Sequence, residues 1–337
     1  MFEFLAAPKA VSSSKLAVVD LFCGTGGFSQ GATDAGHDVV LAVDNWDLAL
    51  EWHKANHPNA TTINLDLPCD ASLLPLPGRG ERPWHLHGSP PCADLSAAHT
   101  SKTAVQVGCA LDRVRWFLKL ALHCTATSWS FEQVAVESVR SLCEEFRAKL
   151  PTKFAYEVVH CNHYGIPQLR KRLIAGPPCL IHRLRQRKRP ASEARVAAWI
   201  TPPPAPCVRF PKRHRRDRGE AERRELLDEA AETLSVEQAG YTITASHAQY
   251  WCTADGRDVQ RMTPAEAAAL QTFPRCFKLP PVNRDAQALI GNAVPPKLAQ
   301  LLLCDNDRYS KLFGSGQKPP LENASPSCTE PQRQEWC

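Results

Sequence analysis

The sequence predicts an α/β protein with a doubly wound, mainly parallel sheet. Short apolar runs of strand type alternate with helical segments over the first half of the chain, and the first run ends in a glycine-rich turn. The runs are apolar throughout, as strands buried on both faces of a parallel sheet are. With 337 residues, 43% of them hydrophobic, the chain can form one large domain and a smaller module.

The predicted elements follow one another along the chain. Residues 15–22 (KLAVVDLF) form an apolar run that enters the glycine turn at residues 24–27, and a helix follows as far as Ala35. Further strands are predicted at residues 39–43, 61–65, 85–91, 129–134, 154–159 and 173–175. Further helices are predicted at residues 48–55, 111–124, 136–150, 263–270 and 295–303. The helix at 263–270 begins with a capping box formed by Thr263 and Glu266.

Between residues 177 and 242 the alternation stops and the segment is rich in proline and arginine. From residue 183 to residue 224 there are fourteen Arg or Lys against four Asp or Glu. The net charge of the whole chain is +5, so the remainder is mildly acidic. Such a block suggests a polyanionic partner, although a solvated surface insert explains it equally well. Residues 226–234 could form a helix within it.

The cysteines and the N-terminal residues indicate the cellular compartment in which the protein is expected. None of the fourteen cysteines forms a C-x-x-C pair, so no metal site is expected. The first fifteen residues do not resemble a secretory signal, and no apolar run is long enough to span a membrane. The protein is therefore expected in a reducing intracellular compartment, the nucleus if the host is eukaryotic and the cytoplasm otherwise.

Acidic residues end two of the predicted strands. Asp44 follows the second strand and Asp66 the third, and both belong at the sheet edge where the glycine turn lies. Asp44 is placed to accept from ribose hydroxyls, and Asp66 from an adenine amine. Each aspartate alone is better explained by a helix cap or a surface position. The ordered series of turn and two acids predicts a nucleoside-binding cleft.

Cys92 follows two prolines directly after a predicted strand. Prolines fix the backbone and suit a rigid loop that aims one side chain. A single cysteine among fourteen is seldom a nucleophile, so this loop alone does not assign a reaction.

Five ordered segments resemble the signature blocks of cytosine-C5 DNA methyltransferases. They are residues 20–28 (DLFCGTGGF), 90–92 (PPC), 167–172 (PQLRKR), 270–274 (LQTFP) and 291–295 (GNAVP). The resemblance implies a Rossmann-like methyltransferase sheet with a small inserted target-recognition region. The implied divisions are a catalytic domain at 15–176, a short basic target-recognition region at 177–260, a return to the catalytic domain with a C-terminal helix at 261–305, and a disordered tail at 306–337.

The resemblance also implies the chemistry. The family transfers a methyl group from S-adenosylmethionine to C5 of a cytosine that is turned out of the duplex. By this resemblance Cys92 adds to C6, Glu132 acts on N3, and Arg170 with Arg172 supports the base. The implied cofactor-binding residues are Phe22, Gly24, Gly26, Gly27, Asp44, Asn45, Asp66, Leu67, Asn292 and Val294.

Two carboxylates compete for the role at N3. The family places a Glu-Asn-Val motif at a strand end, and this chain has Glu132 before Gln-Val and Glu137 before Ser-Val. Glu137 falls on the polar side of a predicted helix, whereas Glu132 ends a predicted strand at the ligand edge, so Glu132 is preferred. The chain departs from the family at Ala93 and Gln133, where Gln and Asn are usual, and at Asn45, where an aromatic residue is common. These departures concern rate and base geometry rather than the class of reaction.

The expected partner is duplex DNA, bound by a monomer that needs neither metal nor membrane. A short basic recognition region can supply phosphate contacts but offers few rigid side chains for base edges, so loose sequence specificity is predicted. Two alternatives remain open: transfer RNA as the substrate of the same family, and a catalytically weak DNA-binding scaffold.

Overall fold

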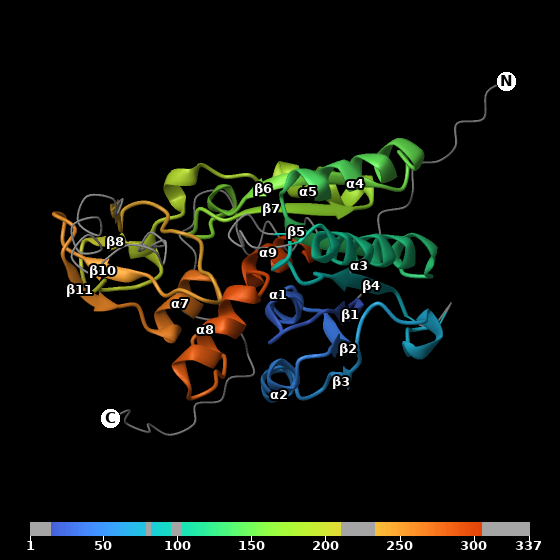
Figure 1. Ribbon diagram of the computed structural model, residues 1–337, viewed down its shortest axis with the longest axis horizontal. Helices are drawn as coiled ribbons and strands as arrows, with labels where there is room; N and C mark the ends of the chain where they lie inside the picture. The colour runs from blue at the N-terminus through green and yellow to red at the C-terminus, as the bar shows by residue number, and fades with distance from the viewer. Residues whose placement is uncertain (1–14, 79–81, 96–102, 210–232, 305–337) are drawn as a thin grey trace.

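The structure is a computed structural model that describes residues 15–78, 82–95, 103–209 and 233–304 (Figure 1). The predicted tail and the second part of the basic block, residues 210–224, lie outside these residues, as does the greater part of the helix expected at 226–234. Among the described residues, no helix is long and apolar enough to cross a membrane.

The main sheet has seven strands in the order β3-β2-β1-β4-β5-β7-β6. All neighbouring pairs are parallel except those of β7, which runs antiparallel to both β5 and β6. The predicted α/β class is therefore confirmed, with one strand reversed. The strands are β1 (Ala17–Leu21), β2 (Asp38–Asp44), β3 (Thr61–Asn64), β4 (Trp84–Gly88), β5 (Ser128–Val134), β6 (Ala155–His160) and β7 (Lys171–Gly176).

Helices cover both faces of this sheet (Figure 1). On one face α3 (Ala104–His123) and α4 (Glu137–Lys149) bury a core that includes Phe117 and Phe131. On the other face α1 (Gly27–Asp34), α5 (Pro178–Gln186) and α9 (Pro296–Leu303) pack around a second core. The helix α2 (Asp47–Asn56) follows β2. The helices α1 and α9 are very close, because a Cβ placed on Gly31 would lie 2.1 Å from the Pro296 carbonyl oxygen.

The helix α5 was not predicted, although its buried residues Leu180, Ile181 and Leu184 have helical spacing. They join the core of the main sheet with α9. The predicted division of the chain at residues 177 and 261 stays a prediction.

A second, antiparallel sheet was also not predicted. It has the strand order β11-β10-β8-β9 and contacts the C-terminal helices through a core that includes Val208 and Trp251. Figure 1 shows this sheet at one end of the molecule. Its elements are β8 (Cys207–Arg209), β9 (Thr233–Ser235), β10 (Tyr250–Cys252) and β11 (Asp258–Arg261), followed by α7 (Pro264–Leu270) and α8 (Asn283–Asn292).

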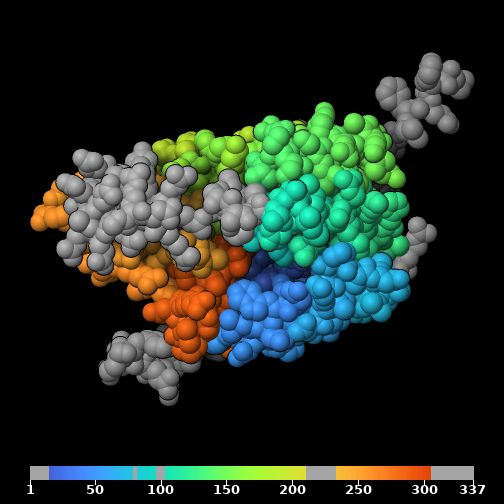
Figure 2. All heavy atoms as spheres, in the orientation of Figure 1, coloured from blue at the N-terminus to red at the C-terminus, as the bar shows by residue number. Residues whose placement is uncertain are grey.

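The order of the main sheet determines where a ligand can bind. From β1 the chain builds β2 and β3 on one side, and then returns to β4 on the other side of β1. Loops that leave β1 and β4 in opposite directions open a crevice at the carboxyl ends of the strands. Figure 2 shows a hollow in one face of the molecule, with dark blue atoms from the beginning of the described chain at its floor.

Candidate active site

The glycine turn after β1 has two kinds of glycine. Gly24, with φ +53°, faces open space, because a Cβ placed on it would meet nothing within 4 Å. Gly26, with φ +97°, and Gly27 are instead packed tightly. A Cβ on Gly26 would lie 2.8 Å from the His57 ring, and one on Gly27 would lie 2.2 Å from the carbonyl oxygen of Val294. Only Gly24 is thus open for the approach of a ligand.

Asp44 holds this turn in place. At the end of β2, its carboxylate accepts from the N–H of Gly24 at 2.8 Å and from the N–H of Trp46 at 3.0 Å. Burial raises the pKa of Asp44, while these two hydrogen bonds oppose the shift. A carboxylate has about four lone-pair sites, so acceptor capacity remains toward the crevice. The predicted ribose acid therefore fixes the backbone of the turn as well.

The other predicted cofactor residues surround the same turn. Asn45 donates from its amide to Asp66 at 3.0 Å, and both side chains are exposed. Leu67 is buried in the main core. Phe22, with φ +57°, packs edge-on against Trp116. The structure places the remaining two at the C-terminal end of α8 and just beyond it: Asn292 is exposed and Val294 is buried.

The Cys92 loop is anchored to β5. The buried amide of Gln133 donates to the Pro90 carbonyl at 2.9 Å, and its oxygen accepts from the N–H of Val134 at 2.8 Å. A turn follows, in which the Leu95 N–H donates to the Cys92 carbonyl at 3.0 Å. Cys92 itself is a half-buried free thiol. Gln133, one of the residues that depart from the family motif, thus anchors the loop of the candidate nucleophile.

The two candidate carboxylates occupy different environments. Glu132 in β5 forms an ion pair with Arg172 of β7 at 2.8 Å, with side chains only 10% and 12% exposed. Glu137 begins α4, where its side chain is 79% exposed and pairs with Arg140. Of the two, only Glu132 is shielded from water and adjacent to the residue that anchors the Cys92 loop.

The two arginines of the predicted base-supporting pair have separate environments. Arg170 is 3% exposed and donates to the carbonyl oxygens of Ile243 at 3.0 Å and Ala293 at 3.1 Å. Burial lowers its pKa to about 10, so the guanidinium stays charged near neutral pH. Arg170 is held by backbone carbonyls, whereas Arg172 is the arginine that contacts a candidate catalytic side chain.

Two glutamines of the signature blocks, for which no role was predicted, complete this arrangement. Gln168 donates to Gln271 at 2.6 Å and to the Leu270 carbonyl at 2.8 Å, and it accepts from the N–H of Ile243 at 2.9 Å. Gln271 in turn donates to the Ala293 carbonyl at 2.7 Å. The arginine, Leu-Gln and Asn-Ala-Val blocks therefore meet in one buried hydrogen-bond network.

A buried polar cluster beneath the glycine turn was not anticipated either. Ser29 donates to Asp20 at 2.7 Å, and its hydroxyl lies 3.0 Å from a ring nitrogen of His53. The rings of His53 and His57 are 4.8 Å apart and both pack under Gly26. Burial raises the pKa of Asp20 to about 7 and lowers the pKa of His57 to about 4.

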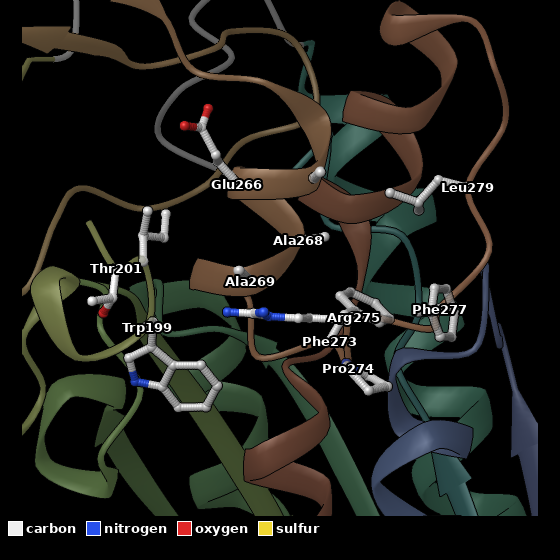
Figure 3. Close-up of a pocket in the computed structure, with 12 residues that line it drawn as sticks. Trp199, Thr201, Glu266, Ala268, Ala269, Phe273, Pro274, Arg275, Phe277 and Leu279 are labelled. Carbon is white, nitrogen blue, oxygen red and sulfur yellow. The ribbon is translucent and has the colours of Figure 1, made fainter. Parts of the chain in front are cut away.

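A cavity of about 330 Å³ lies away from the Cys92 loop (Figure 3). Trp199 and Phe273 line it with Phe277, and the Arg275 side chain extends across it. Phe277 also packs near His57, with ring centroids 6.2 Å apart. No cluster of His, Cys, Asp or Glu suited to a metal ion occurs in the described part of the chain.

Comparison with known proteins adds to this geometry. A family model described as C-5 cytosine-specific DNA methylase matches residues 16–107 and 187–305. The Type II methyltransferase M.HgiDI of Herpetosiphon aurantiacus is 26% identical over 303 residues, which cover 86% of this chain and 94% of that protein. The Type II methyltransferase M.HindV of Haemophilus influenzae is 27% identical over 305 residues, covering 84% and 94%.

Solved structures agree at the level of fold. A crystal structure of the S. pombe Dnmt2 methyltransferase superposes with a TM-score of 0.55 at 15% identity, covering 86% of this chain and 97% of that one. The Entamoeba histolytica methyltransferase EhMeth gives a TM-score of 0.52 at 13% identity, covering 86% and 98%.

Proposed function

The chain belongs to the C-5 cytosine-specific DNA methylase family, and from this premise we propose that it transfers a methyl group from S-adenosylmethionine to cytosine in DNA with Cys92 as the nucleophile. One observation carries the assignment of residues. Gln133 fixes the Cys92 loop through Pro90, and the residue before it in β5 is Glu132, paired with Arg172. Nucleophile and acid thus come from the loop after β4 and from β5, the strand next to it.

The glycine turn fits a nucleoside cofactor. The open side of Gly24 allows close approach, and Asp44 retains acceptor capacity for ribose hydroxyls. Asp66 is exposed beside it, where it could accept from an adenine amine. We assign Gly24, Asp44, Asp66 and Asn292 to this cofactor site. When bound, S-adenosylmethionine supplies an electrophilic methyl group.

The residues of the chain would activate the substrate as follows. The Cys92 thiolate forms a bond to C6 of the flipped-out cytosine, and the ring electrons move toward N3. Glu132, steadied by Arg172, hydrogen-bonds N3 and stabilises the electron-rich ring, so that C5 becomes nucleophilic. After C5 has gained its methyl group, a base removes the C5 proton, the C6–S bond breaks and the thiolate leaves.

A mechanism-based trap tests this proposal. In DNA that contains 5-fluorocytosine, fluorine replaces the C5 proton that must be lost, so the adduct with Cys92 should persist. We expect a covalent complex when protein, this DNA and S-adenosylmethionine are combined, seen by denaturing electrophoresis and peptide mass. Cys92→Ala should abolish the complex, whereas Cys69→Ala, at another half-buried free cysteine, should retain it.

Other outcomes would revise the proposal. A complex with transfer RNA containing 5-fluorocytidine, and none with DNA, would leave the nucleophile in place and replace the substrate. Intact DNA binding without an adduct on either nucleic acid would contradict catalysis and favour a scaffold.

A further inference from the structure

Two cysteines in the second sheet lie directly opposite each other. In the antiparallel pair of β8 and β10, the register joins Tyr250 to Arg209, Trp251 to Val208, and Cys252 to Cys207. The register is unbroken up to the cysteine pair. Among the described strand pairs, no other register brings two cysteines together.

The two side chains share a face of the sheet. Side chains alternate along a strand, and residues that are directly opposite point the same way. Val208 and Trp251 point into the core, so Cys207 and Cys252 lie on the opposite face. Both are free thiols in this structure.

Their spacing suits a disulfide. Directly opposite residues of antiparallel strands have Cα atoms about 4.5 Å or about 5.5 Å apart, depending on the type of pair. Both values fall within the range of roughly 4.4–6.8 Å found in disulfides. The backbone can therefore accept the bond without a change of register.

The two thiols differ in access. Cys207 is half-buried, whereas Cys252 is fully buried. A salt bridge of 3.0 Å between Arg209 and Asp258 spans β10 from one neighbouring strand to the other. Burial raises the pKa of the Cys252 thiol, Cys207 and Asp258 add to this rise, and Arg209 opposes it. An oxidant in solution would thus meet Cys207 first.

We propose that Cys207 and Cys252 form a redox-sensitive pair that closes to a cross-strand disulfide on exposure to hydrogen peroxide. Cys207 attacks the peroxide, gaining an oxygen as sulfenic acid and releasing one water. The Cys252 sulfur then attacks the Cys207 sulfur and a second water leaves. Both sulfurs are oxidised, and the peroxide is reduced.

Peptide mapping after peroxide treatment tests the pair. The full chain in a Cys92→Ala background, which removes a competing thiol, is treated with hydrogen peroxide, alkylated and digested without reductant. We expect a peptide pair joined between positions 207 and 252, lighter by two hydrogen atoms and separated by dithiothreitol. Closing the loop between these positions should raise the thermal midpoint by about 5 °C.

Control variants decide the outcome. Cys207→Ser should remove both the joined peptide and the thermal shift, and this half-buried site makes misfolding a smaller concern than at Cys252. Cys276→Ser, at an exposed cysteine elsewhere, should leave both intact. Sulfinic acid at Cys207 with Cys252 unlinked, or random pairing with other cysteines, would overturn the inference. Because these readouts need no methylation, they are independent of the proposed function.

Discussion

At the residue scale, Gln133 connects the strand of the candidate acid to the loop of the candidate nucleophile. Its amide group makes one hydrogen bond to Pro90 and one to Val134, and it is completely buried. This side chain, which differs from the usual family residue, therefore anchors the loop that carries Cys92.

Replacing Gln133 by Ala should slow methylation by about 10- to 100-fold with little change in KM, because a loop shifted by an ångström loses much of its catalytic geometry. The methylation rate of Gln133→Asn, whose side chain is one methylene shorter, should lie between that of Gln133→Ala and that of the unmodified protein. Single-turnover rates measure the effect, and Gln186→Ala, at an exposed glutamine, is the matched control. An unchanged rate for Gln133→Ala would contradict this positioning role.

The two carboxylates give a second residue-scale prediction. Glu132→Gln should lower the methylation rate by about 100-fold or more, because the amide cannot supply the acid function at N3. Glu137→Gln, on the exposed surface of α4, should leave the rate within twofold of the unmodified protein. The same single-turnover assay applies to both, and the reverse pattern would move the acid to Glu137.

Local features of the site could be predicted from sequence, because neighbouring residues determine them. The glycine turn and the Pro-Pro-Cys loop need only a few consecutive residues. The environment of Arg170 could not be predicted in this way, because its partners Ile243 and Ala293 are 73 and 123 residues away.

At the element scale, the buried network of Gln168, Arg170 and Gln271 joins β7, α7 and the end of α8. Three signature blocks that are separate in the sequence are thus partners in one structural feature. Since these hydrogen bonds are buried, the loss of one partner leaves carbonyl groups without donors.

Replacing Arg170 or Arg172 by Lys should therefore have different effects, one on stability and the other on the methylation rate. Arg170→Lys should lower the free energy of unfolding by about 3 kcal/mol, because an ammonium group cannot reproduce the guanidinium fork. Arg172→Lys should mainly lower the methylation rate. Urea unfolding and single-turnover assays measure the two effects. Equal losses of stability would contradict the distinction, and Lys171→Ala, at an exposed site, serves as the control.

The elements that escaped prediction are short or unusual in composition. Strands β8 to β11 have three or four residues each, too few for an alternating pattern to be recognised. They are held by one another and by α7 and α8 rather than by local preference. The helix α5 did carry a signal, because Leu180, Ile181 and Leu184 have helical spacing, but it was masked by the surrounding proline and arginine.

At the scale of the whole molecule, buried histidines control stability toward acid. Burial lowers the pKa of His53 and His85 to about 3 and of His57 to about 4, and it also lowers the pKa of His87 well below its usual value. In the unfolded chain histidines take up protons below about pH 6.5, whereas the buried histidines of the folded protein stay neutral. Their contribution to the free energy of unfolding is therefore complete above that pH and is lost progressively as the pH falls below it. Asp20 acts in the opposite sense, because its raised pKa of about 7 lets the native carboxyl gain a proton first.

The histidines outnumber the aspartate, so the free energy of unfolding should fall by about 3 kcal/mol between pH 7.5 and pH 5.5. Urea unfolding at the two pH values measures the change. His57→Asn should reduce this loss and Asp20→Asn should increase it. Equal stability at both pH values would show that the histidines are protonated in the native state.

The strands of the central sheet agree with the sequence prediction because each strand is a separate apolar run, whereas their order was not predicted. The convergence of distant segments on the crevice was expected only from the family resemblance, because it depends on pairings such as Gly27 with Val294, which no local pattern indicates.

The close packing of α1 and α9 has a consequence for synthesis of the protein. One face of the sheet is covered by the first helix and by the last described helix. A nascent chain emerging from the ribosome therefore carries an incomplete apolar face until residue 303 has left the exit tunnel. During most of translation this face must be shielded by chaperones or by transient contacts. A chain that is released before α9 has been synthesised would expose this apolar face and be prone to aggregation.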